Sequence, residues 1–258
     1  MTAFDAAYFE SEHVRRQLPL GAPLSAMAKT DSTNDDALAA ARAGAPHGAI
    51  FVADFQHQGR GRGGNPWLAP AGENLTFSVL LRPNLRPEQA PQLTLAVGLA
   101  IRDAVARHLP GEVVGLKWPN DVWVGQRKLA GVLLESITQA GALSAVVAGV
   151  GLNVQTRVFP APLAETATSL ALLGANARRE DLLLEILNEL QPRTEQVAAS
   201  GLRPLLPELR QHDVLAGRRV RVDRIRGVAR GLSENGELLV ETASQLEHVR
   251  AGHVDLLA

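Results

Sequence analysis

Between residues 113 and 150 the chain carries short apolar segments that are separated by turn residues. The segments cover residues 113–118, 122–124, 129–136 and 142–150, and Pro-Asn-Asp, Gly-Gln and Ala-Gly sequences divide them. Short apolar runs joined by such tight turns are typical of hairpins. The pattern predicts a sheet built mostly from consecutive antiparallel strands.

Further strands and helices are predicted around this region. Residues 48–55 and 75–81 have strand character, and the alanine-rich residues 37–43 follow several N-capping oxygens in Ser32-Thr33-Asn34-Asp35. Pro87 and Glu88 are expected to open a second helix that ends before Pro110, and residues 180–199 form a third helical block that Pro192 is expected to bend or break. The expected class is α+β, with a mixed, largely antiparallel sheet packed with helices.

The pattern changes after Asp213. Residues 219–224, 227–232, 236–241 and 246–250 are strand-length pieces separated by Gly and Asn-Gly turns, which predicts a small β-barrel. We therefore expect two domains, residues 1–213 with a variable segment at 1–21, and residues 214–258.

The composition excludes several functional classes. A net charge of −1 supplies no bulk field for nucleic acid or an anionic membrane. The absence of cysteine rules out disulfides, thiolate metal sites and a cysteine nucleophile. Residues 1–20 lack the apolar core of a signal peptide, and no later run has the length of a membrane span, so we expect a cytoplasmic protein.

A glycine-rich loop is the first candidate for chemistry. Residues 59–64 read Gly-Arg-Gly-Arg-Gly-Gly and formally match a dinucleotide-binding motif, but Asn65-Pro66-Trp67 and a strand follow where that motif requires a helix. Backbone N–H groups and two arginines would still suit a phosphate or a carboxylate. The alternative is a flexible hairpin with solvated arginines. The sequence has no P-loop, no serine elbow and no histidine grouping of metal-ligand spacing.

Two of the three lysines fall in a second candidate segment. Lys117 begins Lys-Trp-Pro-Asn-Asp, and Lys128 follows in Arg-Lys-Leu-Ala-Gly. Asn120 and Asp121 would suit Mg²⁺ or phosphate, and Lys128 could neutralise a substrate carboxylate. The alternatives are a plain turn and a strand lysine that extends to solvent.

Two other segments remain ambiguous on sequence grounds. Residues 149–153, Gly-Val-Gly-Leu-Asn, would allow close approach of another backbone or of a ligand, or could form a simple bulge. Ser32, Thr33 and Asn34 could cap a helix or, with Gln56, satisfy a buried ureido or amide group.

Taken in order, five motifs resemble those of the biotin protein ligase family. They are Asp31-Ser32-Thr33-Asn34, Gln56 with Gly59-Arg60-Gly61-Arg62, Lys117-Trp118-Pro119-Asn120-Asp121, Arg127-Lys128-Leu129-Ala130-Gly131 and Gly149-Val150-Gly151-Leu152-Asn153. The resemblance is strong from residue 22 to 154, and the family's Src-homology-3-like barrel matches residues 214–258. It implies an enzyme that uses ATP to make biotinyl-5'-AMP and then biotinylates a lysine of a carboxylase carrier domain.

The resemblance also implies roles for individual residues. The biotin site would comprise Ser32, Thr33, Asn34, Gln56, Arg60, Gly61, Arg62, Lys128 and Gly131. The ATP site would comprise Trp67, Asn120, Asp121, Gly151 and Asn153, with Asp121 the candidate Mg²⁺ ligand. Lys128, Arg60, Arg62 and Lys117 would be the catalytic cations.

This sequence differs from some family members in having Gly63, Gly64 and Asn65 where those proteins have further basic residues. It also has no room before Ala22 for a winged helix-turn-helix, so DNA binding is not implied. A lipoate ligase or octanoyl transferase is the nearest alternative enzyme, and a biotin sensor without turnover is the alternative from another class. A sheet-edge dimer is left open.

Overall fold

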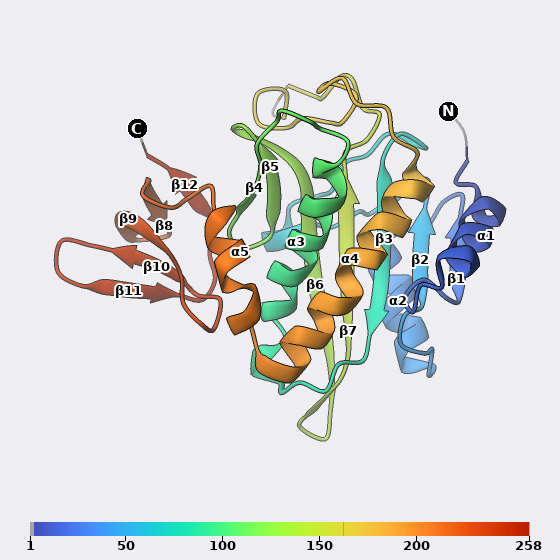
Figure 1. The fold of residues 1–258 in the computed structure, drawn as a ribbon, viewed down its shortest axis with the longest axis horizontal. Helices are drawn as coiled ribbons and strands as arrows, with labels where there is room; N and C mark the ends of the chain where they lie inside the picture. The colour runs from blue at the N-terminus through green and yellow to red at the C-terminus, as the bar shows by residue number, and fades with distance from the viewer. Residues whose placement is uncertain (1–2, 162, 258) are drawn as a thin grey trace.

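The computed structural model describes residues 3–161 and 163–257, which form two β-sheets of unequal size (Figure 1). The larger sheet has the strand order β1-β2-β3-β7-β6-β5-β4. Its strands are β1 (Leu24–Met27), β2 (Ile50–Ala53), β3 (Leu75–Leu81), β4 (Val114–Lys117), β5 (Asp121–Val124), β6 (Arg127–Gln139) and β7 (Ala142–Leu152). Among these strands of the described residues, only β1 and β2 pair in parallel, and β4 to β7 form the predicted consecutive antiparallel hairpins.

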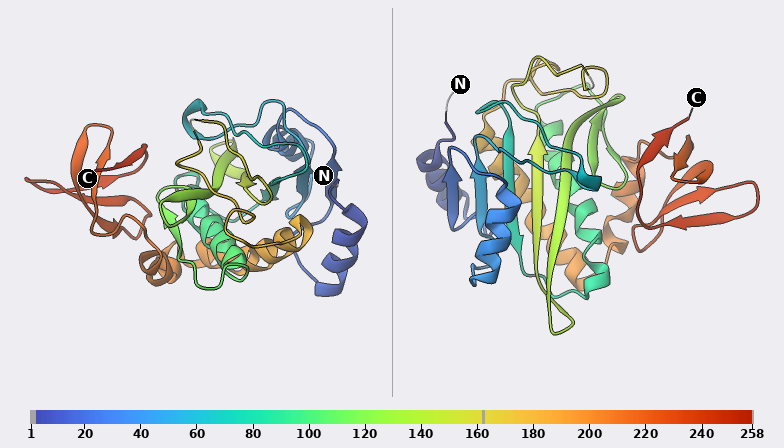
Figure 2. Two further views of the ribbon diagram at one scale, coloured as in Figure 1. Left: turned by 90° about the horizontal axis from the view of Figure 1, so that it is seen from above. Right: turned by 180° about the vertical axis from the view of Figure 1, so that it is seen from behind.

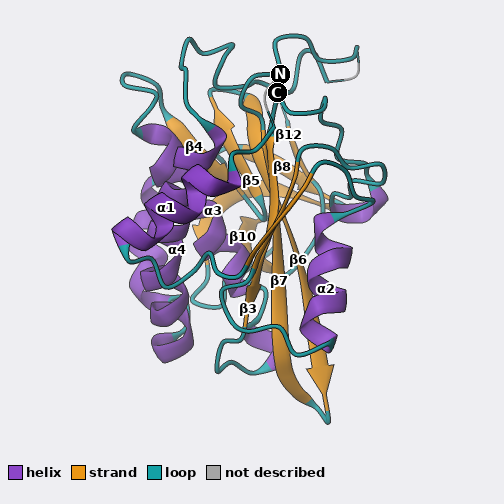
Figure 3. Ribbon diagram, turned by 90° about the vertical axis from the view of Figure 1, so that its right-hand side faces the viewer, coloured by secondary structure: helices purple, strands orange, loops and turns teal. Residues whose placement is uncertain are grey.

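Helices cover both faces of this sheet, as the edge-on view in Figure 3 shows. Helix α2 (Thr33–Arg42) lies on one face, and α1 (Ala6–Arg16), α3 (Gln92–Ala106) and α4 (Arg179–Ser200) lie on the other. The short helix α5 (Leu206–Gln211) follows, with 3₁₀ turns η1 (Arg62–Gly64), η2 (Pro87–Gln89) and η3 (Arg203–Leu205). The main core fills the α3 and α4 side, because β3 and α3 bury almost every apolar side chain there.

Two helical features differ from those predicted from the sequence. Pro87 opens only the turn η2, and α3 begins at Gln92. Helix α4 continues through Pro192 to Ser200, although proline removes one helical hydrogen bond. Next to it, the Arg193 guanidinium donates to the Glu189 carbonyl at 2.9 Å and so supplies a side-chain donor to the same stretch of helix. Helix α1 and strand β1 had no sequence prediction.

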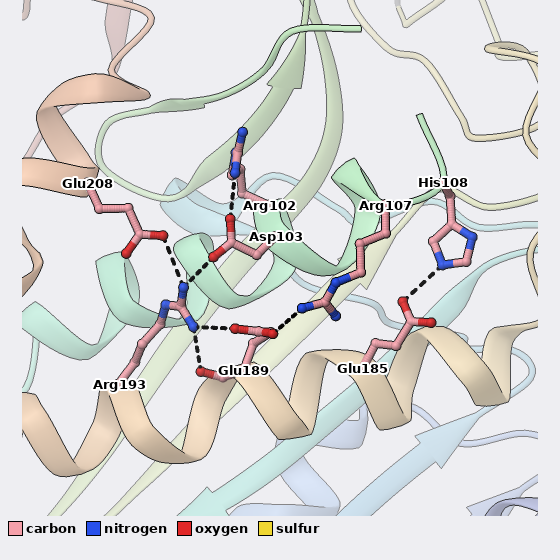
Figure 4. A network of polar contacts seen from close by, with 8 residues as sticks. All are labelled: Arg102, Asp103, Arg107, His108, Glu185, Glu189, Arg193 and Glu208. Atoms are coloured by element: carbon pink, nitrogen blue, oxygen red, sulfur yellow. Dashed lines mark hydrogen bonds and ion pairs between the residues drawn. The ribbon is translucent and has the colours of Figure 1, made fainter. Parts of the chain in front are cut away.

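Arg193 also centres a charged network between α3, α4 and α5 (Figure 4). Its guanidinium contacts Asp103 of α3 and lies 2.6 Å from Glu189 and 3.0 Å from Glu208 of α5. Burial raises the pKa of the Glu208 carboxyl. The pairs Arg102–Asp103 and Arg107–Glu189 extend the network, and a separate pair, His108–Glu185, lies beside it. Three helices are thereby joined behind the sheet.

The second sheet is antiparallel and has the strand order β11-β10-β9-β8-β12. It consists of β8 (Arg219–Val222), β9 (Ile225–Leu232), β10 (Leu238–Glu241), β11 (Leu246–Val249) and β12 (Val254–Leu256). It stands to one side of the larger sheet in both views of Figure 2. The Trp118 indole N–H donates to the Gly236 carbonyl at 2.9 Å and connects the two parts. The expected fold class, with its separate small β unit, is confirmed.

Within the described ranges, none of the helices combines the length and the apolar character that crossing a membrane requires.

Candidate functional site

The site lies on the face of the sheet that α2 covers. Strand register places Thr76, Gly151, Gly131 and Asp121 side by side across β3, β7, β6 and β5. In the neighbouring row Ser78 pairs with Gly149. Three glycines in the middle of the sheet leave a depression where other residues would project side chains.

Each of these glycines lies beneath a side chain that closes the cavity. A Cβ on Gly149 would lie 2.1 Å from the Asn34 side-chain oxygen, and one on Gly151 would lie 2.1 Å from the Trp67 indole. A Cβ on Gly131 would lie 2.9 Å from the Lys128 ammonium nitrogen. The sequence predicted close approach of another backbone or of a ligand at residues 149–151, whereas the groups that approach the sheet here are the side chains of Asn34 and Trp67, and they explain why glycine is needed.

Polar side chains form the inner part of the cavity. Gln56 Oε1 accepts hydrogen bonds from the Thr33 backbone N–H at 2.8 Å and from its hydroxyl at 3.1 Å. Ser78 Oγ lies 2.8 Å from Thr33 Oγ1 and 2.6 Å from Asn34 Oδ1. Ser32 occupies the N-cap position of α2, yet its hydroxyl makes no capping bond. Thr33, Asn34 and Gln56, which line the cavity, are therefore connected by hydrogen bonds, in part through Ser78, and Ser32 lines the cavity beside them.

Cationic side chains lie at the other end of the cavity. Lys128 Nζ lies 2.7 Å from Asp121 Oδ1 and 5.8 Å from the centroid of the Trp67 ring. Arg62 donates to Asn120 Oδ1 at 3.2 Å, while Asn120 Nδ2 donates to the Val132 carbonyl at 3.0 Å. Burial lowers the pKa of Arg62, opposed by the nearby Asp121 carboxylate, but an arginine remains charged at neutral pH.

Arg60 has a different environment from Arg62. Its Nη2 lies 2.5 Å from Asp35 Oδ1 on α2 and 3.0 Å from Glu135 Oε2 on β6. Glu135 Oε2 also accepts a hydrogen bond from Asn34 Nδ2 at 2.7 Å. Arg60 thus has its charge balanced by protein carboxylates.

The cavity brings together most of the residues singled out in the sequence. Its lining includes Ser32, Thr33, Asn34, Gln56, Arg60, Gly61, Arg62, Trp67, Asn120, Lys128, Gly131 and Gly151. Asp121 is not part of this lining but forms an ion pair with Lys128, which is. Lys117 lines a neighbouring hollow, where its Nζ lies 4.5 Å from the Trp123 ring centroid, and burial lowers its pKa despite the nearby Asp121. Asn153 is buried and donates to the Thr168 carbonyl at 3.0 Å, outside the cavity lining.

Four polar residues at the site, Asp35, Thr76, Ser78 and Glu135, were not predicted. Asp35 belongs to the stretch that was assigned to helix capping, whereas the other three lie inside strands that were taken to be mainly apolar. A polar side chain that interrupts an apolar strand was the available signal, because buried polar groups need partners.

For a divalent metal, the donor set is limited. Among the described residues no three acidic or histidine side chains gather as metal ligands. Asp121 supplies one carboxylate beside the Asn120 amide. Mg²⁺ is commonly bound by one or two carboxylates together with substrate phosphates, so this set fits a metal that arrives with a nucleotide.

Comparison with known proteins identifies the class of this fold and cavity. Residues 27–153 match the biotin/lipoate A/B protein ligase family, and residues 216–257 match the biotin protein ligase C-terminal domain. The chain is 38% identical over 241 residues to the biotin–[acetyl-CoA-carboxylase] ligase of Mycobacterium tuberculosis, covering 90% of this chain and 88% of that protein. The chain therefore belongs to the biotin protein ligase family.

Two further relatives agree with this assignment. The bifunctional ligase/repressor BirA of Escherichia coli is 32% identical over 214 residues, which are 81% of this chain and 66% of that protein. The structure of the biotin protein ligase from Aquifex aeolicus in complex with biotin and ATP superposes with a TM-score of 0.78 at 27% identity, covering 92% of this chain and 99% of that one.

Proposed function

We propose that this chain is an ATP-dependent biotin protein ligase that makes biotinyl-5'-AMP and then biotinylates a lysine of a carboxylase carrier domain. The observation that carries the proposal is the division of one cavity into a neutral polar end and a cationic end. Biotin has the same division, because its ureido ring needs hydrogen-bond partners and its carboxylate needs a cation.

The neutral end would hold the ureido ring. Ser32, Thr33, Asn34 and Gln56 present hydroxyl and amide groups that can both donate and accept, as a ureido group requires. All but Gln56 are nearly fully buried, so their hydrogen bonds with a ligand would form away from water and gain in strength. Gly149 lets Asn34 lie directly on the sheet and would thereby fix its orientation.

The cationic end would bring two anions together. An oxygen of the biotin carboxylate attacks the α-phosphorus of ATP, the new C–O–P linkage forms, and the bond to the pyrophosphate oxygen breaks as pyrophosphate leaves. Lys128 would balance the carboxylate charge, and Arg62 with Asn120 would bind the phosphate oxygens. Trp67 and Gly151 would lie at the nucleotide, while Gly61 and Gly131 would let backbone approach the ligands.

Other assigned residues would act from outside the cavity. Asp121 would hold Mg²⁺, which would supply charge compensation to the ATP phosphates. Lys117 would add positive potential from the neighbouring hollow, and Asn153 would hold the segment that contains Thr168. Arg60, by contrast, lines the cavity and would close the glycine-rich loop over the site through its contacts with Asp35 and Glu135.

In the transfer step the ε-amino nitrogen of the carrier lysine attacks the biotinyl carbonyl carbon. The amide bond forms, the bond to the phosphate oxygen breaks and AMP leaves, with one proton released from the amine. No nucleophile of the enzyme takes part, which agrees with the absence of cysteine and of a serine elbow. The proposed partners are biotin, ATP and the carrier, without nucleic acid, and the proposed location is the cytoplasm. The proposed domain boundary falls after Asp213.

Biotin-dependent exchange of pyrophosphate into ATP tests the first half-reaction. Purified protein with Mg²⁺ should show exchange with biotin and none with lipoate or octanoate, and Lys128→Met should remove it. Exchange with lipoate would assign the chain to the lipoate branch of the family. Binding of biotin without exchange would identify a sensor. Incubation of the active protein with a purified carrier domain should then give a biotinylated lysine.

A further inference from the structure

The two arginines of the glycine-rich loop lie in opposite electrostatic environments. Arg60 Nη2 contacts two carboxylates, Asp35 at 2.5 Å and Glu135 at 3.0 Å. Arg62 donates to the neutral Asn120 side chain, and no carboxylate of the described residues lies within ion-pair distance of it. An arginine that two carboxylates neutralise has little net charge left for a substrate anion, whereas Arg62 has the Asp121 carboxylate nearby but no ion pair, so more of its charge remains for a substrate.

Glu135 connects the loop to the inner end of the cavity. The same oxygen, Oε2, accepts from Arg60 and from Asn34 Nδ2, which lies 2.7 Å away. Asn34 continues through Ser78 Oγ to the Thr33 hydroxyl, and Thr33 contacts Gln56. A hydrogen-bonded path therefore runs from Gln56 to the guanidinium of Arg60.

Within this path Asp35 contacts only Arg60, at the end that lies farthest from Gln56. Its carboxylate pairs with Arg60, and its side chain is 54% exposed, against 29% for Glu135. Exposed pairs contribute little because water screens them, so Glu135 is the stronger of the two anchors. It is also the one that contacts Asn34, a residue of the polar inner end of the cavity.

We propose that Glu135 is a positioning residue that latches the glycine-rich loop by holding Arg60, and that it couples this latch to Asn34 in the pocket. Arg62 then faces the reacting anions, and Arg60 does not. Under the proposed function, on which this inference rests, the latch would retain biotinyl-AMP until the carrier arrives.

The first test needs no ligand. Amide hydrogen exchange over residues 59–67 should become roughly tenfold faster in Glu135→Gln and in Arg60→Ala, since each loses a charge-assisted hydrogen bond. Asp35→Asn should change it roughly twofold. Glu241→Gln is the matched control, because it removes the exposed Arg230–Glu241 pair of the second sheet. High salt should accelerate exchange in the wild type and have little effect in Arg60→Ala.

The second test follows the bound intermediate. Biotinyl-AMP should dissociate roughly tenfold faster from Glu135→Gln than from the wild type, and the KM for biotin should rise because Asn34 loses its partner. The kcat of pyrophosphate exchange should stay within about twofold, since Lys128 and Arg62 are unchanged. Arg62→Ala should instead lower kcat. The double variant Arg60→Ala/Glu135→Gln should lose no more loop protection than Arg60→Ala alone.

The outcomes separate the latch from the proposed function. Three results would each overturn the latch. They are unchanged amide protection of the loop in Glu135→Gln, additive effects in the double variant, and a kcat that falls by as large a factor as the retention time of biotinyl-AMP. A wild-type protein without biotin-dependent exchange would overturn the proposed function, while loop protection that still depends on Glu135 would leave the latch standing.

Discussion

At the residue scale, the ion pair of Lys128 and Asp121 allows the proposed substrate contact of Lys128 to be tested separately from its structural contact. Lys128→Met keeps most of the apolar stem and removes the ammonium, so biotin-dependent exchange should fall at least about 100-fold. The same change leaves the Asp121 carboxylate, 19% exposed, without its partner and should lower the free energy of unfolding by about 1–3 kcal/mol.

The double variant Lys128→Met/Asp121→Asn separates these two effects. Urea unfolding should show the stability largely restored, because no uncompensated charge remains, while exchange should stay absent. Normal exchange in folded Lys128→Met would show that the lysine does not contact the reacting carboxylate.

Substitutions of the two glycines beneath the cavity should weaken the binding of different substrates. Gly149→Ala places a methyl group against Asn34 and should raise the KM for biotin roughly tenfold, whereas Gly151→Ala displaces Trp67 and should raise the KM for ATP by a similar factor. Gly98→Ala in α3, where a Cβ would make an ordinary 3.4 Å contact with Leu116, is the control. Steady-state kinetics with each substrate varied measure this, and equal effects of both variants on both substrates would contradict the division of the cavity.

At the scale of elements, the hairpins of β4 to β7 followed from turn residues that lie next to each other in the sequence. The order of the strands did not, because β3 joins β7 through residues that lie some way apart along the chain. The same limit applies to the site. Gly149, Gly151 and Lys128 belong to recognisable motifs, but Arg60, Asp35 and Glu135 meet only after the strand register is set.

The partly buried guanidinium of Arg193 joins helices α3, α4 and α5. Arg193→Met should lower the free energy of unfolding by about 3 kcal/mol at pH 7.5, because Asp103 and Glu208 then lose their shared cation. The loss should be smaller at pH 4.5, because burial raises the pKa of Glu208 and so favours its uncharged form as the pH falls. Urea unfolding at both pH values measures this, and Arg230→Met, which breaks an exposed pair, should change stability far less. An equal loss at both pH values would exclude the carboxylates as the cause.

At the scale of the whole molecule, the segment between the two sheets contains a partly buried acid. Leu116 of β4 donates to the His212 carbonyl at 2.7 Å and accepts from Val214 at 3.0 Å, so this segment extends the edge of the larger sheet. Asp213 lies between these bonds and accepts from the Leu215 N–H at 2.8 Å. Burial raises its pKa to about 6, although backbone N–H groups oppose the change.

This raised pKa predicts how stability changes with pH. Because the folded protein binds the Asp213 proton more tightly than the unfolded chain does, its contribution is fully present below about pH 4 and is lost as pH rises through about 6. Asp213→Asn keeps the acceptor for Leu215 and cannot ionise. It should raise the free energy of unfolding at pH 8 by up to about 3 kcal/mol and have little effect at pH 4. Urea unfolding across this range, with Asp223→Asn in the β8–β9 turn as control, measures the difference. A gain that does not depend on pH would mean that the Asp213→Asn substitution improves packing and that the buried charge costs little.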